Sequence, residues 1–166
     1  MKTVLRTYAL FATLLAAACQ APTEPGIQPV SNADLAIEYA VVGGLRLSDG
    51  PLANHLRIAF DGRATYDERF SSGEVTVVKL GELGADGIAR LDSLFSAQRF
   101  LTLTVEPDSS SFCLVDGGAT VIAYRAMPDT SMHSLTDTGC FQSVPVGFTV
   151  LRYTLRAVIE DSLEDI

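Results

Sequence analysis

The stretch HLRIAFDGRATYDERF, residues 55–70, carries the clearest fold signal in the chain. In its first half, apolar residues at 56, 58 and 60 alternate with other residues, as the side chains of a half-buried strand do. Asp61-Gly62 is a dipeptide typical of a tight turn, and residues 63–70 continue as a second strand. We therefore predict a β-hairpin over residues 55–70.

Further strands are predicted on both sides of this hairpin. Alternation with a period of two gives a strand over residues 35–42, and a valine-rich run gives another over 74–80. Strand signals return in SFCLV (111–115), ATVIAYRA (119–126) and SMHSLTDTGC (131–140). Turns separate these last three runs, one at Asp116-Gly117-Gly118 and one at MPDT (127–130).

The hydrophobic period becomes helical in two places. The first predicted helix covers residues 84–99, where Ile88, Leu91, Leu94 and Phe95 share one face. The second follows Pro145, a residue that suits a first helical turn. Its apolar stripe comprises Phe148, Leu151, Leu155, Val158 and Ile159. The acidic tail EDSLEDI, residues 160–166, is expected to fray into solvent.

This order of elements predicts an α+β domain. The expected architecture is an antiparallel sheet of about five to six strands with two amphipathic helices packed on one face. Short connections favour antiparallel pairing. No internal repeat and no second domain is evident.

The first 18 residues are typical of a secretory signal peptide. Lys2 and Arg6 give a basic start, and residues 7–18 carry no charge and end in small side chains. This run is shorter than the roughly 20 apolar residues that a bilayer span needs. A buried N-terminal helix is the alternative, which the proline-rich segment that follows disfavours.

The segment LAAAC, residues 15–19, resembles the bacterial lipobox. The resemblance implies a diacylglycerol on the Cys19 thiol, cleavage before Cys19 and an acylated new N-terminus, which together suffice for stable anchoring. Leu15 stands four residues before the cysteine rather than the usual three. Plain secretion with a free Cys19 is the alternative.

The predicted organisation is therefore a signal peptide over residues 1–18, a lipidated cysteine with a proline-rich tether over 19–33, and one domain over 34–166. The expected location is the bacterial cell envelope, on its periplasmic or surface side. Gln20 follows the lipobox cysteine where enteric inner-membrane lipoproteins tend to carry aspartate, and this resemblance favours the outer membrane.

Charge excludes several classes of partner. The whole chain has a net charge of −8, and loss of Lys2 and Arg6 with the signal peptide makes it −10. Phosphate backbones and anionic headgroups would be repelled, so we predict no nucleic acid as partner and no electrostatic adsorption to lipid. Membrane attachment is expected through the lipid on Cys19 alone.

Cys113 and Cys140 remain as a pair if Cys19 is lipidated. An even pair in an oxidising compartment predicts a disulfide, which would close a loop of about 28 residues. Two buried free thiols are the alternative. A redox pair is disfavoured because the two cysteines do not form a C-x-x-C motif.

The chain offers no recognisable catalytic or metal-binding constellation. There is no H-E-x-x-H, no G-x-S-x-G, no P-loop and no dinucleotide fingerprint. We interpret His55 and His133 as strand or surface residues, and Asp116, Asp129 and Asp137 as solvated turn residues rather than calcium ligands. We predict no enzyme activity, no catalytic residue, no metal and no cofactor.

The loop GGLRLSDGPLAN, residues 43–54, is the candidate partner-binding segment. It is long for a hairpin connection, and length of this kind often accompanies function. The candidate residues are Gly43, Gly44, Leu45, Arg46, Leu47 and Leu52. The alternative is a loop folded back over the sheet edge, with the glycine pair serving only as a turn or bulge.

Several short motifs resemble small bacterial domains of the emfourin type over about residues 35–160. They are Gly43-Gly44 after the first strand, DGRATY at 61–66, Leu80 before the Leu91/Leu94/Phe95 helix, Phe100, Asp116, and the helix after Pro145. Emfourin inhibits thermolysin-like metalloproteases. The resemblance implies the α+β fold more strongly than the activity, and no inhibitory residue can be carried over.

The predicted function is therefore a non-enzymatic, lipid-anchored module that binds a protein of the envelope. The sharper alternative is an emfourin-like inhibitor of a secreted thermolysin-like metalloprotease.

Overall fold

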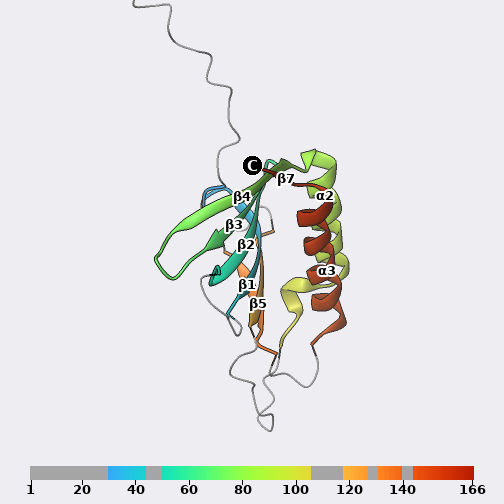
Figure 1. The fold of residues 1–166 in the computed structure, drawn as a ribbon. Helices are drawn as coiled ribbons and strands as arrows, with labels where there is room; N and C mark the ends of the chain where they lie inside the picture. Colours follow the sequence, from blue (N-terminus) through green and yellow to red (C-terminus); the bar gives the residue numbers. More distant parts are fainter. Residues whose placement is uncertain (1–29, 44–49, 106–117, 127–130, 140–143) are drawn as a thin grey trace, which may run out of the picture.

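The structure is a computed structural model that describes residues 30–43, 50–105, 118–126, 131–139 and 144–166. Within these ranges the chain forms one antiparallel sheet and two α-helices (Figure 1). In chain order the elements are β1 (Leu35–Val42), β2 (Ala53–Ala59), β3 (Arg63–Arg69), β4 (Val75–Glu82), α2 (Gly84–Ala97), the 3-10 turn η1 (Phe100–Thr102), β5 (Ala119–Tyr124), β6 (His133–Asp137), α3 (Val146–Asp161) and β7 (Glu164–Asp165).

The hairpin predicted over residues 55–70 is confirmed as β2 and β3. Ile58 pairs with Ala64 beside the turn, and Arg57 pairs with Thr65. Gly62 closes the turn with φ of +93°, a conformation that glycine adopts without strain. Its amide donates to the Ala59 carbonyl at 3.0 Å.

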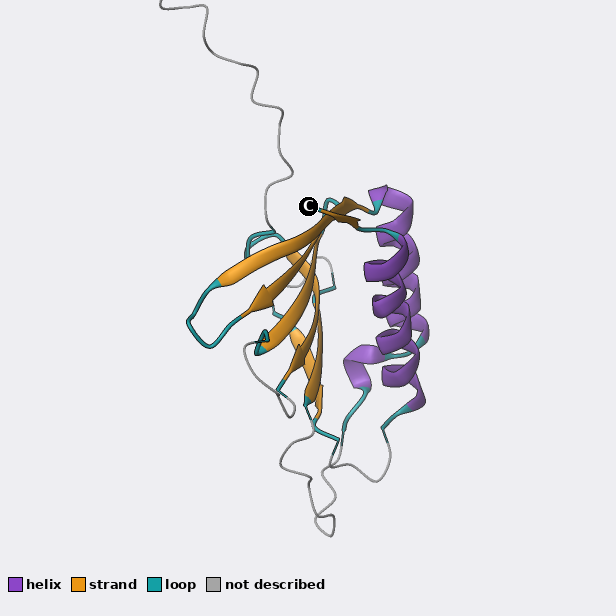
Figure 2. Ribbon diagram, in the orientation of Figure 1, coloured by secondary structure: helices purple, strands orange, loops and turns teal. Residues whose placement is uncertain are grey.

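The α+β prediction is confirmed, and both helices lie side by side on one face of the sheet (Figures 1 and 2). The strand order is β6-β5-β1-β2-β3-β4-β7. The described residues thus form seven strands rather than the five to six expected. The last of them, β7, has only two residues and is too short to give a periodic signal.

The expectation that residues 160–166 fray into solvent is wrong. Helix α3 continues to Asp161, Leu163 is buried, and the two residues of β7 pair with Leu80 and Lys79 of β4. Gly81 permits this approach, because a Cβ there would lie 2.6 Å from the Ser162 carbonyl oxygen. The acidic tail therefore packs on the sheet through the buried Leu163 side chain, and the absence of a side chain at Gly81 leaves room for it.

The hydrophobic core fills the space between the sheet and the two helices. Phe95 of α2 stacks on Tyr124 of β5 with ring centroids 4.4 Å apart, and meets Phe100 edge-on at 5.1 Å. Burial of side chains of this size contributes roughly 1.5–3 kcal/mol each. The fully buried residues of this core also include Leu56, Ile58 and Ile122 on the strands and Phe148, Leu151 and Leu155 on α3.

The described domain begins at residue 30, within the segment assigned to the tether. Val30 is buried against Leu35 and Ala59. The Asn32 side chain accepts a hydrogen bond from Arg57, and the Ala33 carbonyl accepts one from Arg125 at 3.3 Å. Residues 30–33 therefore pack on the sheet at the start of β1.

Several predictions fall outside the described residues. These are the signal peptide over 1–18, Cys19, Cys113, Cys140, the strand over 111–115 and the turn over 127–130. Among the residues that are described, no helix is long and apolar enough to cross a membrane.

Candidate functional site

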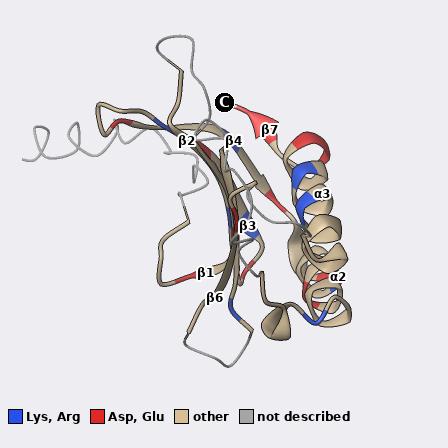
Figure 3. Cartoon of the chain, turned by 90° about the horizontal axis from the view of Figure 1, so that it is seen from below, with Lys and Arg blue, Asp and Glu red and all other residues tan. Residues whose placement is uncertain are grey.

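The face of the sheet opposite the helices is a candidate interaction surface. No helix from the described part of the chain covers it, and Figure 3 shows both helices on the other side of the strands. Strand register places Glu38 opposite Arg57, and His55 opposite Asp67, on this open face. The centre of the open face is therefore charged.

Two close pairs form at this centre. His55 Nδ1 lies 2.9 Å from Glu38 Oε1, and Arg69 Nε lies 3.2 Å from Asp67 Oδ1. The hydrogen bond with His55 is the largest of the effects that lower the pKa of Glu38; burial opposes it. The positive charges of His55, Arg57 and Arg69 lower that pKa further.

The Glu38–His55 pair has the arrangement of an oriented base, but no described residue that pairs with His55 across the strands carries a hydroxyl or thiol nucleophile. The register neighbours of His55 are Ala40 and Asp67, which bring neither a hydroxyl nor a thiol. The pair therefore serves as a cross-strand contact between β1 and β2.

The two ends of the predicted binding loop meet at one end of the sheet. The Gly43 amide donates to the Leu52 carbonyl at 2.9 Å, and the Leu52 amide donates to the Arg69 carbonyl. Gly43 has φ of +80°, which suits the turn that the sequence predicts there. Gly44, Leu45, Arg46 and Leu47 lie outside the described residues.

Three aliphatic side chains are exposed at this end of the sheet, and we call Val42, Leu52 and Val75 the apolar rim. Their exposed fractions are 40%, 44% and 53%. Val42 pairs with Ala53, Ala53 with Arg69, and Arg69 with Val75, so Val42 and Val75 lie in one row across the open face. The sequence singled out Leu52, which directly precedes Ala53 and lies outside this row, and it missed the two valines, which only strand register places in one row.

Gly118 packs closely against this end of β1. A Cβ at Gly118 would lie 2.8 Å from the Gly43 carbonyl oxygen. The backbones of Gly43 and Gly118, the described members of the two glycine pairs, therefore approach each other closely. This agrees with the prediction that the glycines serve a turn or bulge.

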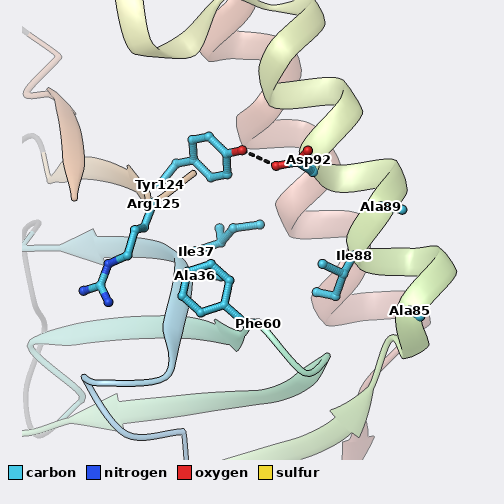
Figure 4. A pocket seen from close by; sticks show the side chains of 9 residues that line it. All are labelled: Ala36, Ile37, Phe60, Ala85, Ile88, Ala89, Asp92, Tyr124 and Arg125. Atoms are coloured by element: carbon cyan, nitrogen blue, oxygen red, sulfur yellow. Dashed lines mark hydrogen bonds between the residues drawn. The ribbon is translucent and has the colours of Figure 1, made fainter. Parts of the chain in front are cut away.

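Two clefts lie between the sheet and the helices, and the sequence predicted neither. The first, of about 350 Å³, opens between β1 and the first half of α2 (Figure 4). Ile37, Phe60 and Ile88 form its apolar walls. Two of the four α2 residues that line it, Ala85 and Ala89, have small side chains, which leaves space there.

The polar groups of this first cleft satisfy each other. The Tyr124 hydroxyl donates to the Asp92 carboxylate across the cleft, while the Arg125 guanidinium points away from them (Figure 4). Burial and this bond raise the pKa of Tyr124 well above its ordinary value. The cleft therefore offers mainly apolar surface to a ligand.

The second cleft, of about 330 Å³, lies between the sheet and the second half of α3. Its lining is largely polar, with Tyr39, Asn54 and Tyr66 on the strands and Arg156 and Glu160 on the helix. These residues are too far apart in the sequence to form a motif. Polar residues at inward positions of strands are the only signal that could have indicated the cleft.

The prediction that Asp137 is a solvated turn residue is wrong. Asp137 ends β6 on the helix-facing side and is only 7% exposed. It accepts the Gly139 amide at 2.8 Å and lies 3.7 Å from Arg152 Nη1. Arg152 on α3 can reach it because β6 lies at the sheet edge beside that helix.

The other candidate residues for metal binding are dispersed. His133 lies in β6 with its ring edge-on to Phe100 at a centroid distance of 5.4 Å. Asp116 and Asp129 lie outside the described residues. Across the described part of the chain, no group of three or more His, Cys, Asp or Glu side chains could hold a metal ion.

No protein-family model matches the chain, and no curated protein matches it. The resemblance to emfourin-type domains and to the lipobox therefore stays a prediction.

Proposed function

We propose that this chain is a lipid-anchored protein of the bacterial cell envelope whose domain binds another protein through the apolar rim. The supporting observation is that Val42, Leu52 and Val75 are all exposed at one end of the sheet, with Val42 and Val75 in one row on the open face. Aliphatic side chains that are exposed together, with polar groups around them, mark interaction surfaces more often than scattered single ones do.

The rim lies at the end of β1 opposite to the point where the chain enters the domain. Residues 30–34 lead into β1 at Leu35, and the strand ends at Val42 in the rim. Eight residues of strand span about 25 Å. A domain held by Cys19 would thus be tethered on one side and would present its rim on the other.

The chemistry of the rim indicates the kind of partner. Arg69 lies between Ala53 and Val75 in the row. Because Arg69 is ion-paired with Asp67, its positive charge is neutralised, and the rim itself is apolar. The chain as a whole is acidic, at −8. We expect an aliphatic patch on the partner, bordered by basic residues that favour encounter with an acidic domain.

Anchoring is tested with the Cys19→Ala variant. We expect it to leave the membrane fraction and to lack the added mass of the lipid, while the unchanged chain fractionates with membranes. A variant that stays in the membrane fraction with unchanged mass apart from the thiol would remove the anchor from the proposal.

Partner binding is tested by capture from envelope extracts with Leu52→Asp and Val75→Asp variants. Each places a charge in the rim, and we expect each to lose at least about tenfold of the captured partner. Tyr153→Asp is the matched control, because Tyr153 is also exposed, at 60%, but lies on α3. Equal loss in the control, or no loss in the rim variants, would contradict the proposal.

The same variants address the emfourin-like alternative. An inhibitor would slow a thermolysin-like protease stoichiometrically, and Leu52→Asp would abolish the effect. Turnover of a labelled substrate panel by the unchanged chain would instead establish an enzyme.

A further inference from the structure

The second cleft is unusual because it is polar where the two layers should be apolar. In a sheet with helices on one face, the space between them normally contains hydrophobic side chains. Here β1, β2 and β3 contribute Tyr39, Asn54 and Tyr66 from neighbouring positions, and Leu56 next to them is fully buried. The polar cleft thus adjoins an ordinary core.

The cleft contains hydrogen-bonding groups without partners. The side-chain amide group of Asn54 donates a hydrogen bond to the Tyr66 hydroxyl. The Asn54 Oδ1 atom is buried and has no hydrogen-bond donor. Arg156 and Glu160 form no ion pair with any described residue. A buried acceptor without a donor is costly and indicates a group that a ligand or water completes.

Both tyrosines remain able to donate at neutral pH. Burial is the main effect that raises the pKa of Tyr39 and of Tyr66 above 10.0. The positive charge of Arg156, which lines the same cleft, acts in the opposite direction on the pKa of both tyrosines. The cleft therefore presents two hydroxyls, an amide, a guanidinium and a carboxylate to one volume.

The charges of the cleft select a neutral ligand. Arg156 is offset by Glu160 on the next turn of α3, and the charge of Glu68 also acts on Tyr66. A free anion would meet these carboxylates, and a cation would meet Arg156. A neutral molecule with several hydroxyls suits the site, because each hydroxyl both donates and accepts.

We propose that this cleft is a binding site for a neutral saccharide, with one pyranose ring between the strand tyrosines and α3. A sugar hydroxyl would donate to Asn54 Oδ1, and others would accept from Arg156 and the tyrosine hydroxyls and donate to Glu160. A volume of about 330 Å³ is at the small end of ligand sites and suits one ring unit.

The test is a titration of the ¹⁵N-labelled 166-residue chain with glucose and with N-acetylglucosamine, followed by NMR. We expect saturable shifts of the Asn54 side-chain amide and of the Tyr39 and Tyr66 backbone amides at millimolar sugar. Arg156→Gln should weaken binding at least about tenfold, since a charged hydrogen bond is lost. The matched control is Arg90→Gln, an exposed position on α2 outside the cleft, which should bind normally.

Three results would overturn the proposal. The first is the absence of shifts in the cleft up to about 50 mM sugar, far above the dissociation constant of a weak ligand. The second is equal binding by the Arg156→Gln and unchanged chains. The third is displacement by acetate at equal concentration, which would make the cleft an anion site.

Discussion

Glu38 and His55 show how single residues hold the centre of the open face. Their side chains join β1 to β2 at 2.9 Å, in the strand pair that connects the hairpin to the rest of the sheet. Because the hydrogen bond from His55 lowers the pKa of Glu38, the ionised carboxylate is the form that the folded state favours. The stabilisation is therefore present above the ordinary pKa of 4.5 and is lost as the pH falls through the lowered value.

The Glu38→Gln variant tests this residue. We expect it to lose about 0.5–1.5 kcal/mol of unfolding free energy at about pH 7, since a charge-assisted contact is replaced by a neutral one. The difference from the unchanged chain should shrink as the pH falls below 4.5 in urea unfolding experiments. Glu74→Gln, in the exposed β3–β4 turn, is the control.

A constant difference across this pH range would show that Glu38 contributes through packing alone. The same result in the Glu74→Gln control would point to a general effect of net charge.

At the scale of single residues, the sequence predicted conformation better than contacts. The turn at Gly62 was predictable because its signal is local. The burial of Asp137 was not, because Arg152 reaches it from another element. The same holds for Asn54, whose neighbours in the lining of the second cleft come from β1, β3 and α3.

At the scale of elements, the C-terminal segment shows how a short sequence can close one edge of the sheet. Leu163 inserts into the core, and β7 then pairs with β4, where Lys79 Nζ lies 3.2 Å from Asp165 Oδ1. This exposed ion pair contributes little by itself. The buried leucine is therefore the main attachment of the segment.

Substitution of Leu163 measures that attachment. Leu163→Ala should destabilise the domain by about 2–4 kcal/mol in urea unfolding, because it removes a buried side chain. Ile166→Ala is the matched control, since Ile166 is 76% exposed, and it should change stability by less than about 0.5 kcal/mol. Equal small effects of both variants would mean that the tail does not dock.

Elements with a repeated pattern were predictable, and those without one were not. The strands β1 to β6 and both helices are long enough to show a periodic pattern of apolar residues. Each was predicted close to its observed bounds. β7 has two acidic residues and no period. Its position depends on a glycine and a leucine in other segments, which no local pattern connects.

At the scale of the whole molecule, the fold separates the entry of the chain from the apolar rim. The chain enters the domain beside Val30 and Leu35. Val42 is the last residue of β1, and Val75 is the first residue of β4. The α+β architecture followed from the sequence pattern. The rim did not, because only strand register places two of its three residues in one row.

Photo-crosslinking in intact cells tests the central claim, that the rim is where a partner protein binds. A photoreactive amino acid would replace Val75 or Leu52 in turn, and Tyr153 on α3 as the control. If a partner protein binds at the rim, we expect the same discrete protein adduct from both rim positions and none from position 153. Adducts from position 153 alone, or from no position, would contradict it.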